Sequence, residues 1–275
     1  MRLSALSRWG LGLWSALVVG FLILPLGVIV LFAFDASNVQ TFPIQHWTTH
    51  WFHVAWNDPA VRSALWLSIK AGALATLLAL VFGTLIAFGI HRFRFFGRNT
   101  LSLLLVLPLA LPGIVTGLAL QSAFFLVGIQ FSLYTIVIGH STFCIVVVFN
   151  NVVARLRRTS TTLIEASSDL GASPAQTFRL VTFPMISTAL ISGALLAFAL
   201  SFDEVIVTTF TAGAQNTLPL WIFGAIRLGQ QLPEVNAVVV GVLLVTALPL
   251  VVAARLTGGE RISSRSPRIG LPAGE

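Results

Sequence analysis

The chain has 275 residues, of which 56% are hydrophobic and 9% charged, and its mean hydropathy is +0.94. Soluble domains carry about 25% charged residues, so this composition excludes a soluble globular protein. The apolar runs are too long for the strands of a membrane barrel and do not alternate, which predicts an all-α integral membrane protein. The net charge of +7 comes from arginines between the apolar runs, so it requires no nucleic-acid partner.

Six apolar segments predict six transmembrane helices. They cover residues 11–34, 64–90, 101–127, 131–154, 184–211 and 235–256. The first segment is longer than the core of a signal peptide and no cleavage site closes it, so we expect it to be an uncleaved span. Residues 1–257 then form a single polytopic transmembrane domain. Residues 258–275 are rich in Gly, Ser, Pro and Arg, which predicts a flexible tail.

The distribution of basic residues predicts the orientation of these spans. Six spans place both termini on one side of the membrane, and that side holds thirteen of the sixteen Lys and Arg residues. Basic residues are concentrated in cytoplasmic segments. We therefore expect cytoplasmic N- and C-termini.

The first outer segment, residues 35–63, is predicted to lie along the membrane surface. Three tryptophans occur there among polar residues: Trp47, Trp51 and Trp56. Three histidines share the segment at helical spacing: His46, His50 and His53. No acid or cysteine joins them at the spacing of a ligand set, so we expect no metal site.

The third apolar segment contains Pro108 and Pro112, one helical turn apart. Proline removes a backbone donor and kinks a helix, which a membrane tolerates where other groups or a water-filled cavity take up the freed carbonyls. The pattern predicts a bent helix. A pore-facing helix and an irregular packed helix both remain open.

A polar segment between the fourth and fifth spans, residues 155–184, carries the clearest local signals. Thr162 and Glu165 form a candidate capping box, Gly171 suits a left-handed helix end, and Ser173 and Gln176 form a second candidate box. Four residues fall on one helical face: Leu163, Ala166, Ser167 and Leu170. The pattern predicts a short helix, a glycine turn and a second helix. An ordinary connector requires less than this, whereas a helix placed in a partner's groove suits it.

This segment resembles the EAA loop of ABC importer permeases. The matching residues, at the family's spacing, are Glu165-Ala166-Ser167, Gly171, Val181 and Phe183-Pro184. Ser167, Val181 and Phe183 replace the family's Ala, Ile and Leu. The resemblance implies a type I ABC importer permease-like fold with a cytoplasmic coupling helix. It implies a role in ATPase coupling for Glu165, Ala166, Ser167, Leu170 and Gly171.

A second resemblance, to the spermidine/putrescine permease branch, extends over nearly the whole chain. It rests on Trp51-Phe52, Asp58-Pro59, Ala64, Ser68, Ser201 to Glu204, Thr211 to Gly213, Thr217 to Leu220, Gly224, Ile226-Arg227, Gly229, Pro233-Glu234 and Asn236-Ala237. It implies inward transport of a polyamine across a bacterial cytoplasmic (inner) membrane. Permeases for opines and aminoethylphosphonate also belong to this branch, so such a substrate remains an alternative.

The resemblance also implies the partners. They are two ATP-binding cassette ATPase subunits, a second homologous permease chain, an external (periplasmic) substrate-binding protein and the membrane lipid.

Asp203 and Glu204 interrupt the fifth apolar segment. A carboxylate within a membrane costs a few kcal/mol or more, so such residues normally face a cavity or a partner. Adjacent helical residues point about 100° apart, so one acid is expected to face a substrate pathway. An attractive path for a cationic amine and a structural ion pair with Arg227 or Lys70 are both open.

The motifs of enzymes are missing from the sequence. It has no Gly-x-x-x-x-Gly-Lys-Ser/Thr motif, so ATP hydrolysis must occur in another subunit. A membrane-embedded carboxylate enzyme is the alternative class, but HExxH and GxSxG are also absent. We therefore expect a transport subunit without catalytic residues or a cofactor. A channel would leave the capped helix unexplained.

Overall fold

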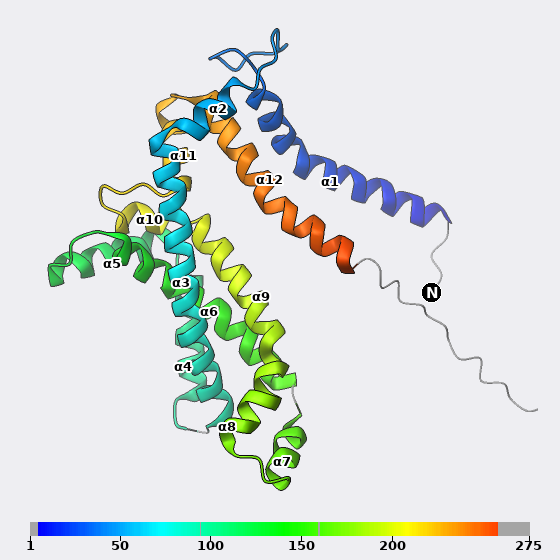
Figure 1. Ribbon diagram of the computed structural model, residues 1–275, viewed down its shortest axis with the longest axis vertical. Helices are drawn as coiled ribbons and strands as arrows, with labels where there is room; N and C mark the ends of the chain where they lie inside the picture. Colours follow the sequence, from blue (N-terminus) through cyan, green and yellow to red (C-terminus); the bar gives the residue numbers. More distant parts are fainter. Residues whose placement is uncertain (1–4, 94, 159, 258–275) are drawn as a thin grey trace, which may run out of the picture. The chain divides into compact units, whose positions relative to one another are not determined.

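The computed structural model describes residues 5–93, 95–158 and 160–257 (Figure 1). Every regular element within these ranges is a helix. The contacts divide the chain into two compact units. One combines the described residues up to Ala55 with those from Gln231 onward, and the other runs from Trp56 to Gln230. The predicted tail, residues 258–275, lies outside the described residues, and the single polytopic domain stays a prediction.

The first unit is built on two helices that contact each other, α1 (Ala5–Ala33) and α12 (Leu232–Thr257). After α1 the chain folds back on itself. The indole N–H of Trp51 donates to the carbonyl oxygen of Asp35 at 2.8 Å, and the rings of Phe34 and Phe52 lie 5.0 Å apart between centroids. These contacts anchor the start of α2 (His50–Asn57) in the predicted outer segment.

The second unit has a core of three helices, α3 (Pro59–Arg92), α6 (Leu133–Arg158) and α9 (Phe183–Phe202), each contacting the other two. Helix α3 begins five residues before the predicted segment because Asp58 caps it. The Asp58 carboxylate accepts the N–H of Ala60 at 2.7 Å, and Pro59 occupies the first helical position.

Helix α3 buries a stripe of small side chains at intervals of three or four residues. The stripe consists of Ala64, Ser68, Ala71, Gly72, Ala75, Ala79, Gly83 and Ala87. Small residues let helix backbones approach closely, which is how helices associate in lipid. Within this stripe the approach is closest at Gly83, where an added Cβ would lie 2.8 Å from the carbonyl oxygen of Ile145 on α6.

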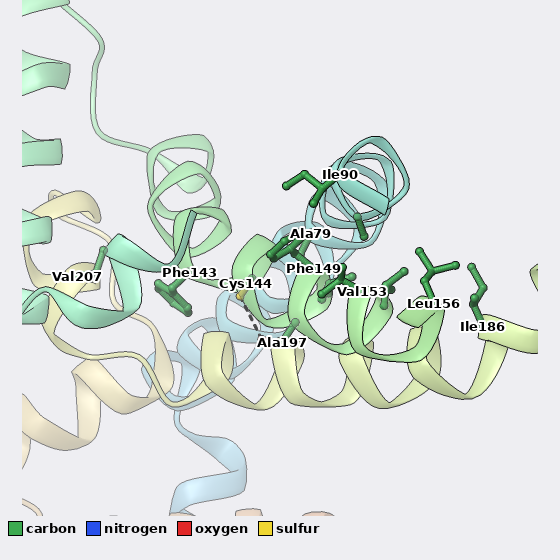
Figure 2. Close-up of a cluster of buried hydrophobic side chains, with 13 residues drawn as sticks. Ala79, Ile90, Phe143, Cys144, Phe149, Val153, Leu156, Ile186, Ala197 and Val207 are labelled. Atoms are coloured by element: carbon green, nitrogen blue, oxygen red, sulfur yellow. Dashed lines mark hydrogen bonds between the residues drawn. The ribbon is translucent and has the colours of Figure 1, made fainter. Parts of the chain in front are cut away.

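Helix α6 supplies the large side chains that fill the space left by this stripe. Figure 2 shows Phe149, Val153 and Leu156 of α6 between Ile90 of α3 and Ile186 of α9. Along the same helix, Cys144 is buried and its thiol donates to the carbonyl oxygen of Ala197 at 3.3 Å. The core therefore combines interlocking apolar side chains with a polar contact to a backbone carbonyl.

The third predicted span is two helices rather than one bent helix. Helices α4 (Arg98–Ala110) and α5 (Gly113–Val127) meet at 102°. Leu111 has an extended conformation, as expected of a residue before proline, and Pro112 begins α5 as its N-cap. Pro108 lies inside α4, so the two prolines do not share the face of a single helix. By length and composition, the pair is a broken span or a re-entrant loop.

The fifth predicted span also breaks. The chain reaches α9 through α8 (Pro174–Thr177) and a π-helical turn, η1 (Phe178–Thr182), so that residues 174–202 form one apolar helical run. Helix α9 ends at Phe202, and a short helix α10 (Ile206–Thr211) follows. The prediction of one helix through residue 211 is therefore wrong, and the acidic pair lies in the break.

Four helices in the described residues are long and apolar enough to cross a membrane, and the bent pair brings the count to five. The four single helices are α1, α3, α6 and the run that includes α9. The sixth predicted segment corresponds to α12, whose apolar stretch is shorter where it is described, and six spans stay a prediction. Helix α11 (Leu218–Leu228) lies between α10 and α12 in the chain.

Replacing Gly83 by alanine should destabilise the protein. The new methyl group would meet a backbone oxygen that cannot rotate away, and overpacking of this kind costs about 1–3 kcal/mol. Gly89→Ala on the same helix is the matched control, because nothing lies within 4 Å of its added Cβ. Thermal unfolding of the purified protein in one detergent should show a lower midpoint for Gly83→Ala alone. Equal midpoints for the two variants would contradict the close packing of α3 on α6.

Candidate functional site

The polar segment before the α9 run forms a helical hairpin, as predicted, with a different first cap. Helix α7 (Thr161–Asp169) begins after Ser160, whose hydroxyl accepts the N–H of Thr162 at 3.3 Å. The prediction of a capping box led by Thr162 is therefore wrong by two residues. Thr162 lies inside the first turn, because Ser160 has the extended backbone that an N-cap requires.

The turn between the two helices follows the prediction. Gly171 has a φ of +79°, which lies in the left-handed region. Its N–H donates to the carbonyl of Ser168 at 2.9 Å, and the N–H of Ala172 donates to that of Ser167 at 3.0 Å. This pair of bonds is the Schellman arrangement, which satisfies the last carbonyls of a helix. The turn direction therefore depends on a residue that tolerates positive φ.

The second helix starts at the predicted capping box. The Gln176 side chain accepts the N–H of Ser173 at 2.8 Å, and the Ser173 hydroxyl accepts the N–H of Gln176 at 3.4 Å. Pro174 occupies the first helical turn. These reciprocal bonds fix the point at which the chain enters the α8–α9 run.

The two sides of α7 have different surroundings. Leu163 and Leu170 are 51% and 89% exposed, and Ala166 between them is also exposed. Ser167 is half-buried, and its hydroxyl lies 2.8 Å from that of Thr177 on α8. The predicted single face of four residues is thus divided: three small or apolar side chains point outward, while Ser167 joins the helices of the hairpin.

The two predicted pathway acids lie in the break between α9 and α10, where they have different environments. Asp203 is the C-cap of α9 and is exposed. Glu204 is half-buried, and its carboxylate accepts the N–H of Val207 at 2.9 Å. The expectation that these adjacent acids lie on one continuous helix is wrong, because α9 ends at Phe202 and α10 begins at Ile206. Glu204 satisfies a backbone donor at the start of α10, which leaves Asp203 as the exposed acid.

Lys70 of α3, one of the two predicted ion-pair partners of the acids, lies next to an aromatic side chain. The Lys70 ammonium lies 5.2 Å from the ring centroid of Trp66, within range of a cation–π contact.

A groove of about 440 Å³ lies between the C-terminal part of α6 and the N-terminal part of α9. Its lining comprises Asn150, Asn151, Ala154, Arg155, Arg158, Thr188, Ala189 and Ser192. The Nε–H of Arg155 donates to the carbonyl oxygen of Met185 at 2.7 Å, which secures one wall. Amide, hydroxyl and guanidinium groups form part of the lining of this groove, between two otherwise apolar helices.

An exposed stripe on α9 connects the groove to Asp203. It follows helical spacing through Thr188, Ser192, Leu195, Ala199 and Asp203. The groove was not predicted from the sequence. Its signals were an Asn-Asn pair in an apolar run and two hydroxyls four residues apart, and neither shows which helix face is exposed.

The family of the chain follows from comparison with known proteins. Residues 65–258 match the family model of the binding-protein-dependent transport system inner membrane component. Because this match covers most of the chain, the protein belongs to that family. It is a multi-pass inner-membrane transport subunit and not an enzyme.

Two curated relatives are similar along most of their length. The putrescine transport system permease protein PotI of Escherichia coli (strain K12) is 36% identical over 225 residues, which are 79% of each chain. The spermidine/putrescine transport system permease protein PotC of the same strain is 31% identical over 247 residues, covering 89% of this chain and 92% of PotC.

Two solved structures share the fold. One belongs to a bacterial ABC transporter involved in the import of the acidic polysaccharide alginate, with a TM-score of 0.66 at 16% identity over 95% of this chain and 100% of that one. The other belongs to the MetNI methionine ABC transporter in an inward-facing conformation, with a TM-score of 0.59 at 18% identity over 73% of this chain and 95% of that one. The permease-type fold is therefore established for this chain.

Proposed function

We propose that this protein is the permease subunit of an ATP-driven importer that moves a small cationic amine, such as spermidine or putrescine, inward. The similarity to PotI and PotC supports a polyamine. The observation that carries the amine assignment is the exposed Asp203 carboxylate, which ends a membrane-spanning helix. An acid at this position attracts a cation and repels an anion.

In this proposal the α7–α8 hairpin transmits ATP hydrolysis. Its outward residues are Leu163, Glu165, Ala166 and Leu170, which are all exposed. They would bind in a groove on an ATP-binding cassette ATPase, because a short capped helix with an apolar stripe suits such a groove. Gly171 and Ser167 keep the hairpin in shape. The remaining partners are a second homologous permease chain, an external (periplasmic) binding protein and lipid, without nucleic acid.

The substrate pathway in this proposal follows the exposed stripe of α9. It begins at Asp203, near the outer end, and reaches the groove between α6 and α9 at the inner end. Attraction at the acid would admit an amine, and hydroxyl and amide oxygens would replace part of its hydration further in. Arg158 at the groove would disfavour retention of a cation and so favour release. The α4–α5 break at Pro112, with Pro108 before it, is assigned to the wall of this pore.

Neutralising Asp203 should impair amine transport more than neutralising Glu204. Asp203→Asn removes charge from an exposed position, and a loss of about 1–3 kcal/mol of attraction corresponds to a several-fold to roughly hundred-fold lower flux. Glu204→Gln is the matched control, since its amide oxygen can still accept the Val207 N–H. Amine uptake into vesicles, normalised to assembled complex, measures both variants.

Unchanged uptake in Asp203→Asn would rule out its role in the pathway. A lower yield of assembled complex with normal normalised uptake would assign Asp203 to structure instead. Preferential uptake of an anionic aminoethylphosphonate, or of an opine, would overturn the amine assignment and leave the importer class intact.

Gly171→Val should uncouple ATP hydrolysis from transport. A β-branched residue at a φ of +79° is strained by on the order of 1 kcal/mol or more, which would displace α7. Gly171→Asn is the control, because asparagine tolerates the left-handed region. We expect substrate-stimulated ATPase activity to fall in the valine variant alone, while the external binding protein still binds its substrate. Normal stimulation in Gly171→Val would contradict the coupling role.

The proposal places both termini in the cytoplasm, on the basis of the arginine distribution. Cysteine labelling in intact cells checks this orientation in a Cys144→Ser background. An impermeant thiol reagent should label Asn38→Cys and Asn57→Cys from outside but should label Ser264→Cys only after the membrane is opened. The reverse labelling pattern would invert the topology.

A further inference from the structure

We propose that His140 is a positioning residue that holds the break between α9 and α10 and thereby orients Asp203. This inference rests on the proposed function, since the importance of Asp203 comes from the substrate pathway. His140 lies on α6, is 1% exposed and is not part of the groove or the hairpin. A buried imidazole within an apolar helix needs partners for both ring nitrogens.

The ring of His140 contacts both sides of the break. Its Nδ1 lies 2.7 Å from the hydroxyl of Ser201, in the last turn of α9. Its Nε2 lies 2.9 Å from the hydroxyl of Thr208, on α10. Asp203 and Glu204 fall between these two contacts in the chain. One side chain on α6 therefore connects the end of one helix to the next.

The hydrogen-bond directions determine which nitrogen of His140 carries a proton. Thr208 donates its single hydroxyl hydrogen to the carbonyl oxygen of Glu204 at 2.6 Å, so this hydroxyl accepts from His140. Nε2 is then the protonated nitrogen, and Nδ1 accepts from the Ser201 hydroxyl. The neutral ring satisfies both partners, and the Thr208 bond extends this connection to the backbone of Glu204.

Neighbouring contacts also join α6 to both sides of the broken segment. One helical turn away, Cys144 donates to Ala197 of α9. On the other side, the Thr135 hydroxyl lies 2.7 Å from the carbonyl oxygen of Thr211. Between them, an added Cβ on Gly139 would lie 3.2 Å from Val207 and 3.3 Å from Thr211, so α10 lies close against α6. His140 therefore lies between the contacts of α6 with α9 and those of α6 with α10.

Removing the hydrogen bonds of the His140 ring should change the accessibility of residue 203 to a reagent. We would introduce Asp203→Cys in a Cys144→Ser background and measure its rate of reaction with a charged thiol reagent in the assembled complex. His140→Leu should change this rate several-fold. His140→Gln should restore much of it, because an amide can donate to Thr208 and accept from Ser201. Thr208→Val should reproduce the leucine effect, since it removes the hydroxyl and keeps the shape.

Thr142→Val is the matched control on the same helix, because the Thr142 hydroxyl donates to the Gly139 carbonyl of its own helix. It should leave the labelling rate unchanged. An unchanged rate in His140→Leu, in complex that assembles normally, would overturn the positioning role. The positioning role would also be overturned if His140→Gln were labelled at the rate of His140→Leu while Thr208→Val were labelled at the rate of the control.

Transport measurements separate this inference from the proposed function. With Asp203 in place, His140→Leu should raise the KM for amine uptake with a smaller change in the maximal rate, and Asp203→Asn should remove most of the additional effect. A change in labelling together with normal amine uptake in Asp203→Asn would refute the pathway but support the positioning role. Normal labelling together with impaired uptake in Asp203→Asn would refute the positioning role alone.

Discussion

The close approach of α3 to α6 is the constraint on which the second unit depends. Lipid tails are as apolar as leucine, so helices in a membrane associate through van der Waals contact and hydrogen bonds rather than through a hydrophobic driving force. The small-residue stripe of α3 brings its backbone near that of α6 at Gly83. Helix α6 then presents its other buried face to α9, so both helices are positioned relative to this one central element.

The breaks in the spans are possible because their backbone groups are satisfied locally. At the α9–α10 break, Glu204 accepts the N–H of Val207 and Thr208 donates to the Glu204 carbonyl. Non-helical backbone within a membrane requires such partners or a water-filled cavity. Helix α5 packs against α10, where an added Cβ on Gly117 would lie 2.5 Å from the Phe210 ring. The two broken segments therefore support each other in the structure.

The hairpin is held together on one side by its own hydrogen bonds and is exposed on the other. The Gly171 turn, the Ser173 capping box and the Ser167–Thr177 contact are bonds within the hairpin. They leave Leu163 and Leu170 exposed on the opposite side. The hairpin continues directly into α9, since α8, η1 and α9 form one helical run. This continuity connects the proposed ATPase contact with the groove and Asp203.

The sequence alone determined the class of protein, the helical apolar segments, and the glycine turn and second cap of the hairpin. These features depend on hydrophobic length and on caps and turns within a few residues, as at Gly171 and Ser173. The sequence also indicated that Asp203 and Glu204 were unusual, but their different environments were decided by the tertiary structure. The residues on the two sides of the break after Phe202 bond to His140 of α6, which is 61 residues from Ser201 and 68 from Thr208 in the chain.

The tertiary structure likewise decided that α4 and α5 separate at Pro112 and that Ser167 turns inward. It also decided that Asn151 and Ser192 share a groove and that His140 spans a break. Periodicity places a residue on one face of its own helix, but it carries no information on which neighbouring helix meets that face. The hydrogen bonds that satisfy a buried polar group in lipid can come from any helix that packs close enough, and only the packed arrangement selects it.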